Sequence, residues 1–143
     1  MSEEIFIPFN TPSLKNSKIK TSRGVFRSKT VNKYLREIGV QNYSPSRKEV
    51  KEYKTRPNLF REAFEKAKWE KPETVIVLGF HFVRGTRHKF DFGNISQAPL
   101  DLMTAHDFIE DDNMDFVIPM PYKKKGKWYT YNKENPGVFI KVS

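Results

Sequence analysis

A nearly continuous apolar run, TVIVLGFHFV at residues 74–83, constrains the fold of this chain more than any other segment. It is rich in β-branched and aromatic residues, and it lacks the polar alternation of a strand with one face in water. The run therefore predicts a central strand of a β-sheet. His81 lies inside it, and we interpret this residue as a structural histidine rather than a metal ligand.

The segments on either side of this strand supply its partners. Residues 5–9 (IFIPF) are β-prone, and Pro8 favours an edge position because proline cannot donate to a ladder. Pro119 predicts a second edge or a bulge for the same reason. Helical periodicity and β-branched or aromatic runs predict the remaining elements. The expected helices are 28–38, 57–69 and one beginning at Asn94, and the expected later strands are 116–120, 128–131 and 137–142.

This order of elements, β-α-α-β-α-β-β-β, predicts an α+β fold with a small mixed sheet flanked by helices. At 143 residues, of which 37% are hydrophobic, the chain is expected to form a single domain, residues 1–143. Asn94 is a good N-cap for the third helix. Pro99 lies too deep for a first helical turn, so a kink or a delayed start of this helix is expected.

Charge is distributed unevenly along the chain. The 26 lysines and arginines exceed the 17 acids and give a net charge of +9, and residues 13–71 alone carry 17 basic and 6 acidic residues. Nucleic acid is the commonest partner for such a balance. The turn-rich segment after the first strand is either a solvated loop or a phosphate-binding loop. Its basic residues are Lys15, Lys18, Lys20 and Arg23.

The sequence also excludes several kinds of protein. It contains no cysteine, which removes disulfides, thiolate metal sites and cysteine nucleophiles. No apolar run approaches the roughly 18 residues that a membrane-spanning helix needs. The first residues, MSEEIFIPFN, lack the charged and apolar regions of a signal peptide, so we expect a cytoplasmic protein.

A group of acids interrupts this basic chain. Between positions 101 and 115 the sequence places six acids and neither lysine nor arginine, and Asp91 stands upstream. Asn94, Gln97 and Asp101 are spaced i, i+3 and i+7, which places them on one stripe of the expected helix. Carboxylates from two separate elements are how Mg²⁺ sites are assembled in phosphoryl-transfer enzymes. The six acids are Asp101, Asp107, Glu110, Asp111, Asp112 and Asp115.

The alternative to a metal site is an acidic surface loop. We assign Asp107, Glu110 and Asp115 to such a loop, because each lies outside the helical stripe. Asp91, Asp101, Asp111 and Asp112 stay as candidates for both interpretations.

At these positions the sequence resembles the RusA family of Holliday junction resolvases, which are small, dimeric, phage-derived endonucleases. The family motif is an Asp-x-Asp-Asn opening a helix, an apolar-Asp pair seven residues past the Asn, and an Asp-Asp pair ten residues further on. Residues 91–94, 100–101 and 111–112 match these three parts with every spacing kept. The segment PFNTPSLKNSK also resembles the family's loop after its first strand. Residues 24–56 look like an insertion and a basic helical region.

The resemblance implies a Mg²⁺-dependent, homodimeric endonuclease, with Mn²⁺ as a possible substitute, that resolves four-way DNA junctions in recombination, repair or phage DNA processing. For a phage-encoded protein the cytoplasm would be that of the host. The resemblance implies that Asp91 and Asp112 are catalytic metal ligands and that Asp111 is a further catalytic candidate. Either Asp111, Asp101 or Asn94 completes the coordination, or the ion keeps more water, and Asn94 and Gln97 support the site. The residues expected to contact DNA are Lys15, Lys18, Lys20, Arg23, Arg84, Arg87 and Lys89.

Two positions depart from the family motif. Gly93 replaces the second acid of the opening, and Gln97 replaces the lysine that usually follows the Asn by three residues. An alternative function is therefore a catalytically impaired protein of the same fold that binds branched or duplex DNA. A third is an RNA-directed nuclease or binder whose aromatic residues stack on unpaired bases. The aromatic residues considered for this role are Tyr34, Tyr43, Tyr53 and Trp128.

Overall fold

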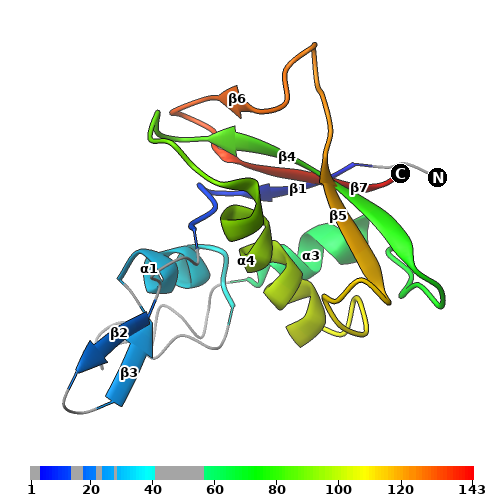
Figure 1. Cartoon of the computed structure of the whole chain (residues 1–143), viewed down its shortest axis with the longest axis horizontal. Helices are drawn as coiled ribbons and strands as arrows, with labels where there is room; N and C mark the ends of the chain where they lie inside the picture. The colour runs from blue at the N-terminus through cyan, green and yellow to red at the C-terminus, as the bar shows by residue number, and fades with distance from the viewer. Residues whose placement is uncertain (1–3, 14–17, 22–23, 28, 41–56) are drawn as a thin grey trace.

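The computed structural model describes residues 4–13, 18–21, 24–27, 29–40 and 57–143. These residues form a mixed α+β structure with a five-stranded sheet, a separate two-stranded hairpin and three helices (Figure 1). The strands are β1 (Ile5–Pro8), β2 (Lys18–Thr21), β3 (Gly24–Arg27), β4 (Ile76–Arg84), β5 (Val117–Pro121), β6 (Thr130–Tyr131) and β7 (Gly137–Val142). The helices are α1 (Lys29–Glu37), α3 (Leu59–Lys66) and α4 (Phe92–Ala105). The α+β class and the mixed sheet flanked by helices are confirmed.

The sheet is built around β4, as the apolar run predicts. Its order is β1-β7-β4-β5, with β6 also pairing with β4 at Val83 and Arg84. β4 pairs antiparallel with β7 and parallel with β5. Pro8 lies in β1 and Pro119 in β5, the two strands at the ends of this order, so both proline predictions are confirmed. An edge strand tolerates proline because one side of it needs no ladder bond.

The hydrophobic core lies between one face of this sheet and the helices α3 and α4, which lie below the strands in Figure 1. Successive residues of a strand point to opposite faces, so Leu78, Phe80 and Phe82 share the core face. Phe64 of α3 stacks on Phe108 with the ring centroids 4.5 Å apart. Burial of these large rings supplies most of the favourable free energy of folding.

His81 points to the other face of the sheet and is buried. Its Nδ1 lies 2.9 Å from the carbonyl oxygen of Tyr122, and its Nε2 lies 3.2 Å from the hydroxyl of Thr130. The histidine thus joins β4 to the chain between β5 and β6, which is the structural role expected for it.

Helix α4 begins earlier than expected. Its N-cap is Asp91, not Asn94, because the Asp91 Oδ1 accepts a hydrogen bond from the Gly93 N–H at 2.9 Å. Of the two alternatives for Pro99, the delayed start was wrong, because Pro99 lies buried inside the helix, and the kink stays a prediction. A carboxylate at the N-terminus also interacts favourably with the helix dipole, which favours the earlier start.

The basic segment after β1 is not a loop throughout. Residues of β2 and β3 pair antiparallel, with Lys18 opposite Arg27, so part of the expected loop is a hairpin. Helix α1 falls within the 24–56 region that looks like an insertion, yet Val31, Tyr34 and Leu35 belong to the same buried core as the sheet. Whether this region is an insertion relative to other proteins stays a prediction.

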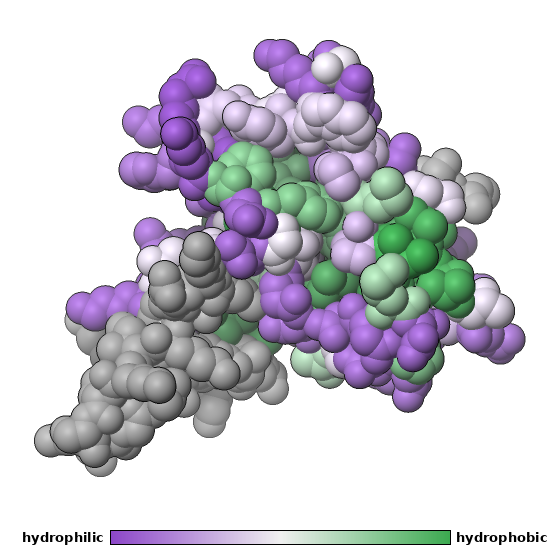
Figure 2. Space-filling view, in the orientation of Figure 1, coloured by the Kyte–Doolittle hydropathy of each residue, from purple (hydrophilic) through white to green (hydrophobic). Residues whose placement is uncertain are grey.

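Two surface properties complete the fold. Val75, Phe116 and Met120 are exposed at the start of β4 and along β5, and Figure 2 shows hydrophobic residues gathered on the right of the molecule, where β5 lies. Strongly hydrophilic residues gather at the top of the same view, around the chain between β5 and β6. Among the described residues, no helix is both long and apolar enough to cross a bilayer.

Candidate acidic site

The acids predicted to form a site lie on helix α4 and on the turns that follow it. Asp91 caps the start of α4 and is exposed. Gly93 lies in the first turn of the helix, and a Cβ atom added there would meet only Asp91 Oδ1, at 3.4 Å. That distance is an ordinary contact, so the backbone does not require glycine at this position. Asn94, half-buried, donates its backbone N–H to the Asp91 carbonyl at 3.1 Å.

Gln97 joins two of the predicted acids. Its Nε2 atom lies 2.6 Å from Asp101 Oδ1 and 2.5 Å from Asp112 Oδ2. The two hydrogens of one amide group are thus donated to two carboxylates. Asp101 lies one helical turn after Gln97, whereas Asp112 lies fifteen residues away on the turn before β5. The structure therefore brings together two carboxylates from separate elements, Asp101 and Asp112. The Asp91 carboxylate accepts from the Gly93 N–H instead, and its role as a metal ligand stays a prediction.

Asp111 shapes the turn that presents Asp112. Its Oδ1 accepts the backbone N–H of Asp112 at 2.7 Å, and its Oδ2 accepts the Asn113 side-chain amide at 3.2 Å. Asn113 Oδ1 in turn accepts the backbone N–H of Asp115 at 2.9 Å. Asp111 and Asn113 thus fix the loop by local hydrogen bonds that polar side chains commonly make in turns.

The oxygen atoms around Gln97 suit Mg²⁺ chemically, since Mg²⁺ prefers carboxylate oxygens and keeps several waters. Asp101 Oδ1 and Asp112 Oδ2 both lie within hydrogen-bond distance of one nitrogen atom, so a small cation would replace the Gln97 amide with little movement of the two acids. Among the described residues, no three acidic or histidine side chains come together as a metal-binding group. The residues therefore fit an ion held by two carboxylates and water better than one held by three or four side chains.

Asp107 and Glu110 belong to the surface, as expected. Lys71 Nζ lies 2.6 Å from Asp107 Oδ1 and 2.7 Å from Glu110 Oε2, and both acids are exposed. Hydrogen bonds to these two carboxylates raise the pKa of Lys71. Exposed ion pairs of this kind contribute little to stability. They do give both acids a partner other than Gln97.

The predicted DNA-binding residues other than Arg84 divide into three groups. Lys15 and Arg23 lie outside the described residues, and Lys18 and Lys20 lie in β2, of which only the backbone is described. Arg87 and Lys89 are exposed, with the Arg87 guanidinium carbon 4.0 Å from the centre of the Tyr131 ring.

Arg84 differs from the expectation of an exposed DNA contact. It is only 7% exposed, and its Nη1 donates to the Thr11 carbonyl at 2.6 Å. Burial lowers the pKa of Arg84. Its place at the end of the central strand explains why it is buried. Arg84 ties the segment after β1 to the sheet, and its contact with a DNA phosphate stays a prediction.

The aromatic residues considered for base stacking also divide. Tyr34 is 3% exposed and belongs to the core, so it is not available to a base. Tyr43 and Tyr53 lie outside the described residues. Trp128 is 56% exposed. The adjacent exposed rings Tyr129 and Tyr131 were missed, although the local sequence KKKGKWYTY carries the signal of aromatic residues beside lysines.

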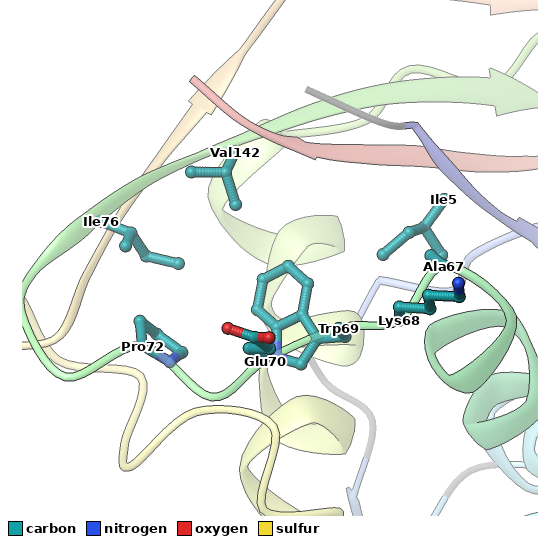
Figure 3. A pocket seen from close by; sticks show the side chains of 8 residues that line it. All are labelled: Ile5, Ala67, Lys68, Trp69, Glu70, Pro72, Ile76 and Val142. Carbon is teal, nitrogen blue, oxygen red and sulfur yellow. The ribbon is translucent and has the colours of Figure 1, made fainter. Parts of the chain in front are cut away.

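A hollow of about 470 Å³ lies elsewhere, between the end of α3 and the ends of β1, β4 and β7 (Figure 3). Apolar side chains such as Ile5, Ile76 and Val142 form its walls, together with the Trp69 ring. Trp69 Nε1 donates to the Phe108 carbonyl at 2.8 Å, which holds the ring in place. This hollow lacks the paired carboxylates of the Gln97 cluster and is a gap in packing rather than a site for the predicted chemistry.

No protein-family model matches the sequence, and no curated protein does.

Proposed function

We propose that the chain is a Mg²⁺-dependent, structure-selective DNA endonuclease of the RusA kind, acting on four-way junctions. The observation that carries the proposal is the approach of Asp101 and Asp112, from α4 and from the turn before β5, to the single Gln97 amide. These are two of the acids that the motif spacing selects. Their approach supports a shared role for residues that lie far apart in the sequence.

Each residue of the proposed site has a defined task. Asp112 and Asp101 hold the cation, Asp111 fixes the backbone of Asp112, and Asp91, at the start of the same helix as Asp101, is the further candidate ligand. A bound Mg²⁺ supplies an activated water and stabilises charge on the phosphate during in-line displacement. The chain's net charge of +9 supplies the attraction for the DNA backbone.

We also propose a homodimer. A four-way junction has two-fold symmetry, and symmetric cleavage needs two sites related by a matching axis. The resemblance to the RusA family supports this proposal, and the interface between the two copies is left open.

A second candidate function is DNA binding without cleavage. The observation that favours it is again Gln97, whose amide already satisfies one oxygen of each acid. Gly93 adds to it, because the family's second acid is missing where the backbone would accept a side chain. In this case the chain would recognise branched or duplex DNA by charge.

Metal-dependent stabilisation separates the two candidates. A ligand that binds only the folded state stabilises it by mass action, by about 2.7 kcal/mol at a concentration one hundred times its Kd. We expect Mg²⁺ or Mn²⁺ to raise the Tm of the wild type, and to raise that of Asp112→Asn much less. Asp107→Asn is the matched control, since it removes an exposed acid outside the cluster and should keep the metal response. A wild-type Tm that does not respond to either metal would favour binding without cleavage.

A further inference from the structure

The face of the sheet that points away from α3 and α4 has a distinct set of side chains. Gly79, His81 and Val83 of β4 point to it, because they alternate with the core-facing residues of the same strand. Phe139 of β7 and Phe6 of β1 lie there as paired neighbours, with ring centroids 4.7 Å apart. The sheet therefore carries rings on both faces, and none of the helices in the described part of the chain lies over this one.

The chain between β5 and β7 only partly covers this face, and it leaves a hollow of about 590 Å³. In Figure 1 this chain lies above the strands, on the side opposite α3 and α4. Gly79 makes room for the Tyr122 ring, since a Cβ atom on Gly79 would lie 2.8 Å from Tyr122 Cδ1. The residues that line the hollow include Phe6, His81, Lys124, Thr130, Tyr131 and Phe139.

Three exposed aromatic rings lie in β6 or directly before it. Tyr131 lines the hollow, whereas Trp128 and Tyr129 precede β6 and the Tyr129 ring packs edge-on against Phe90. Trp128 is 56% exposed, Tyr129 is 52% exposed and Tyr131 is 38% exposed. These are large fractions for aromatic side chains, which usually bury their rings. Three exposed rings within four residues mark an interaction surface rather than an incidental exposure.

Lysine side chains lie close to aromatic rings on this side of the molecule. Lys124 Nζ lies 3.9 Å from the centre of the Phe139 ring, Lys123 Nζ lies 4.9 Å from that of Trp128, and Lys141 Nζ lies 4.4 Å from that of Tyr122. Residues 122–141 contain six lysines and one acid, Glu134. The surface therefore alternates aromatic and positively charged groups.

The acid Glu4 on this face is already neutralised. Lys124 Nζ donates to its two carboxylate oxygens at 2.7 and 2.8 Å, and the Tyr122 hydroxyl also donates to it. Burial alone would raise the pKa of Glu4, but the hydrogen bonds from Lys124 and Tyr122 outweigh burial and lower it. Because Glu4 is paired with Lys124, it does not neutralise the positive charges of Lys123, Lys125 and Lys127.

We infer that this aromatic and basic face, made by the sheet face opposite the helices and residues 122–131, binds single-stranded nucleic acid. Unpaired bases would stack on Trp128 and Tyr131, and the phosphates between them would meet the neighbouring lysines. A duplex offers its phosphates but not its stacked base faces, so it would use only half of the surface. A second copy of the chain would bring like charges together, which disfavours it as the occupant.

The inference goes beyond the proposed nuclease, because the two surfaces use different residues. The acidic cluster depends on Gln97, Asp101 and Asp112, which lie on α4 and the turn before β5. A strand could bind to the aromatic and basic face whether or not the acids cleave anything.

The test is fluorescence anisotropy with labelled oligonucleotides of about 15 nucleotides, the upper range of a site for a small single-strand binder. The protein is Asp112→Asn in metal-free buffer, so that cleavage cannot interfere. We expect oligo-dT to bind more tightly than a duplex of equal length. A parallel measurement with oligo-rU shows whether the face accepts both ribose and deoxyribose. Equal affinity would mean that only stacking and phosphate contacts contribute. Weaker oligo-rU binding would mean that the face prefers DNA.

Variants added to this protein locate the contacts. Trp128→Ala and Tyr131→Ala should each weaken oligo-dT binding by about tenfold, the loss of one stacked base. Lys123→Gln should weaken it less and reduce its salt dependence. The matched controls are Phe116→Ala, an exposed ring beside β5, and Lys66→Gln, an exposed lysine of α3, and both should bind as before.

Two results would overturn the inference. One is duplex binding as tight as single-strand binding and unchanged in both ring variants, which would mean that charge alone acts. The other is a dimer in sedimentation that Trp128→Ala converts to monomer, which would mean that a second copy covers the face. Single-strand binding with no junction cleavage by the wild type would leave this inference intact while removing the proposed nuclease.

Discussion

Gln97 holds two carboxylates with one amide group. We expect its removal to lower stability in the absence of metal and to strengthen metal binding. Without Gln97, Asp101 and Asp112 lose a shared donor while their charges stay close together. We expect Gln97→Ala to lower the free energy of unfolding in EDTA by about 1 kcal/mol, the scale of a hydrogen bond to a charged group near solvent. The measurement is urea unfolding of both proteins.

The same substitution should strengthen metal binding, because no amide competes with the cation between the acids. The Mg²⁺ concentration that gives half of the maximal Tm shift should then be lower for Gln97→Ala than for the wild type. A variant that loses the Tm response altogether would show that Gln97 helps to hold the ion rather than occupying its place.

His106, at the end of α4, is joined to Asn58, at the start of α3, when its ring is neutral. Its Nδ1 lies 2.7 Å from the Leu102 carbonyl and its Nε2 lies 3.0 Å from the Asn58 side-chain amide, so the ring donates to one and accepts from the other. Burial lowers the pKa of His106, and the charge of Arg61 also lowers it, against the opposing effect of the Leu102 carbonyl. Protonation would place two donors, His106 Nε2–H and Asn58 Nδ2–H, against each other.

Because the folded state binds this proton more weakly than the unfolded state, stability is complete above pH 6.5 and falls as the pH drops below that value. We expect urea unfolding to show this loss between about pH 6.5 and pH 5. His106→Leu should flatten this part of the profile, whereas His88→Leu, at an exposed position, should keep it. A profile that stays unchanged in His106→Leu would contradict this role.

At single residues, the motif spacing selected Asp101 and Asp112, which meet at Gln97, but also Asp91 and Asp111, which accept local hydrogen bonds instead. It did not predict how the basic residues are used. Spacing of i, i+4 on a helix places Gln97 beside Asp101, and the resemblance added Asp112. The burial of Arg84 depends on the Thr11 carbonyl, which lies 73 residues away in the sequence. Contacts of this kind come from the tertiary fold and leave no local pattern.

Two glycines in regular elements, Gly137 in β7 and Gly93 in α4, differ in whether the structure has room for a side chain. A Cβ atom on Gly137, at the start of β7, would lie 2.4 Å from the Ile7 carbonyl oxygen and 2.5 Å from Phe6 Cζ. The neighbouring strand β1 therefore packs against a bare backbone. Gly93, in the first turn of α4, has only the 3.4 Å contact with Asp91 Oδ1.

We expect Gly137→Ala to destabilise the protein by about 2 kcal/mol or more, because the backbone of β1 must move to admit the methyl group. Gly93→Ala should instead stabilise it by up to about 1 kcal/mol, because alanine loses less entropy in a helix. Thermal unfolding of the two variants compares the same chemical change in two elements. Equal effects would contradict the packing described for Gly137.

The elements themselves were largely predictable. The run at 74–83 gave β4 because a long β-branched and aromatic segment has few other solutions, and the two prolines marked the edge strands. The start of α4 was placed three residues late because Asn94 and Asp91 are both good N-caps, and only the hydrogen bond from the Gly93 N–H decides between them. The hairpin of β2 and β3 was missed because its four-residue strands, KIKT and GVFR, are too short to show a pattern of apolar alternation.

At the scale of the whole molecule, the fold separates two surfaces of different chemistry. The acidic cluster lies with α4, and the aromatic and basic face lies on the sheet face without helices. Composition predicted the overall positive charge, which suits a polyanionic partner. It did not predict the second surface, because β4 is apolar at nearly every position and so hides which of its residues face the helices.

Cleavage of a labelled four-way junction is the measurement that decides whether the acids gathered by Gln97 form a metal-dependent nuclease site. The wild type, Asp112→Asn and the control Asp107→Asn are compared with Mg²⁺ and with Mn²⁺. We predict paired, symmetric nicks from the wild type and from Asp107→Asn, with a loss of at least about a hundredfold in rate for Asp112→Asn. Tight junction binding by the wild type without a nick in either metal would contradict the proposed nuclease site and leave a protein that binds DNA without cutting it.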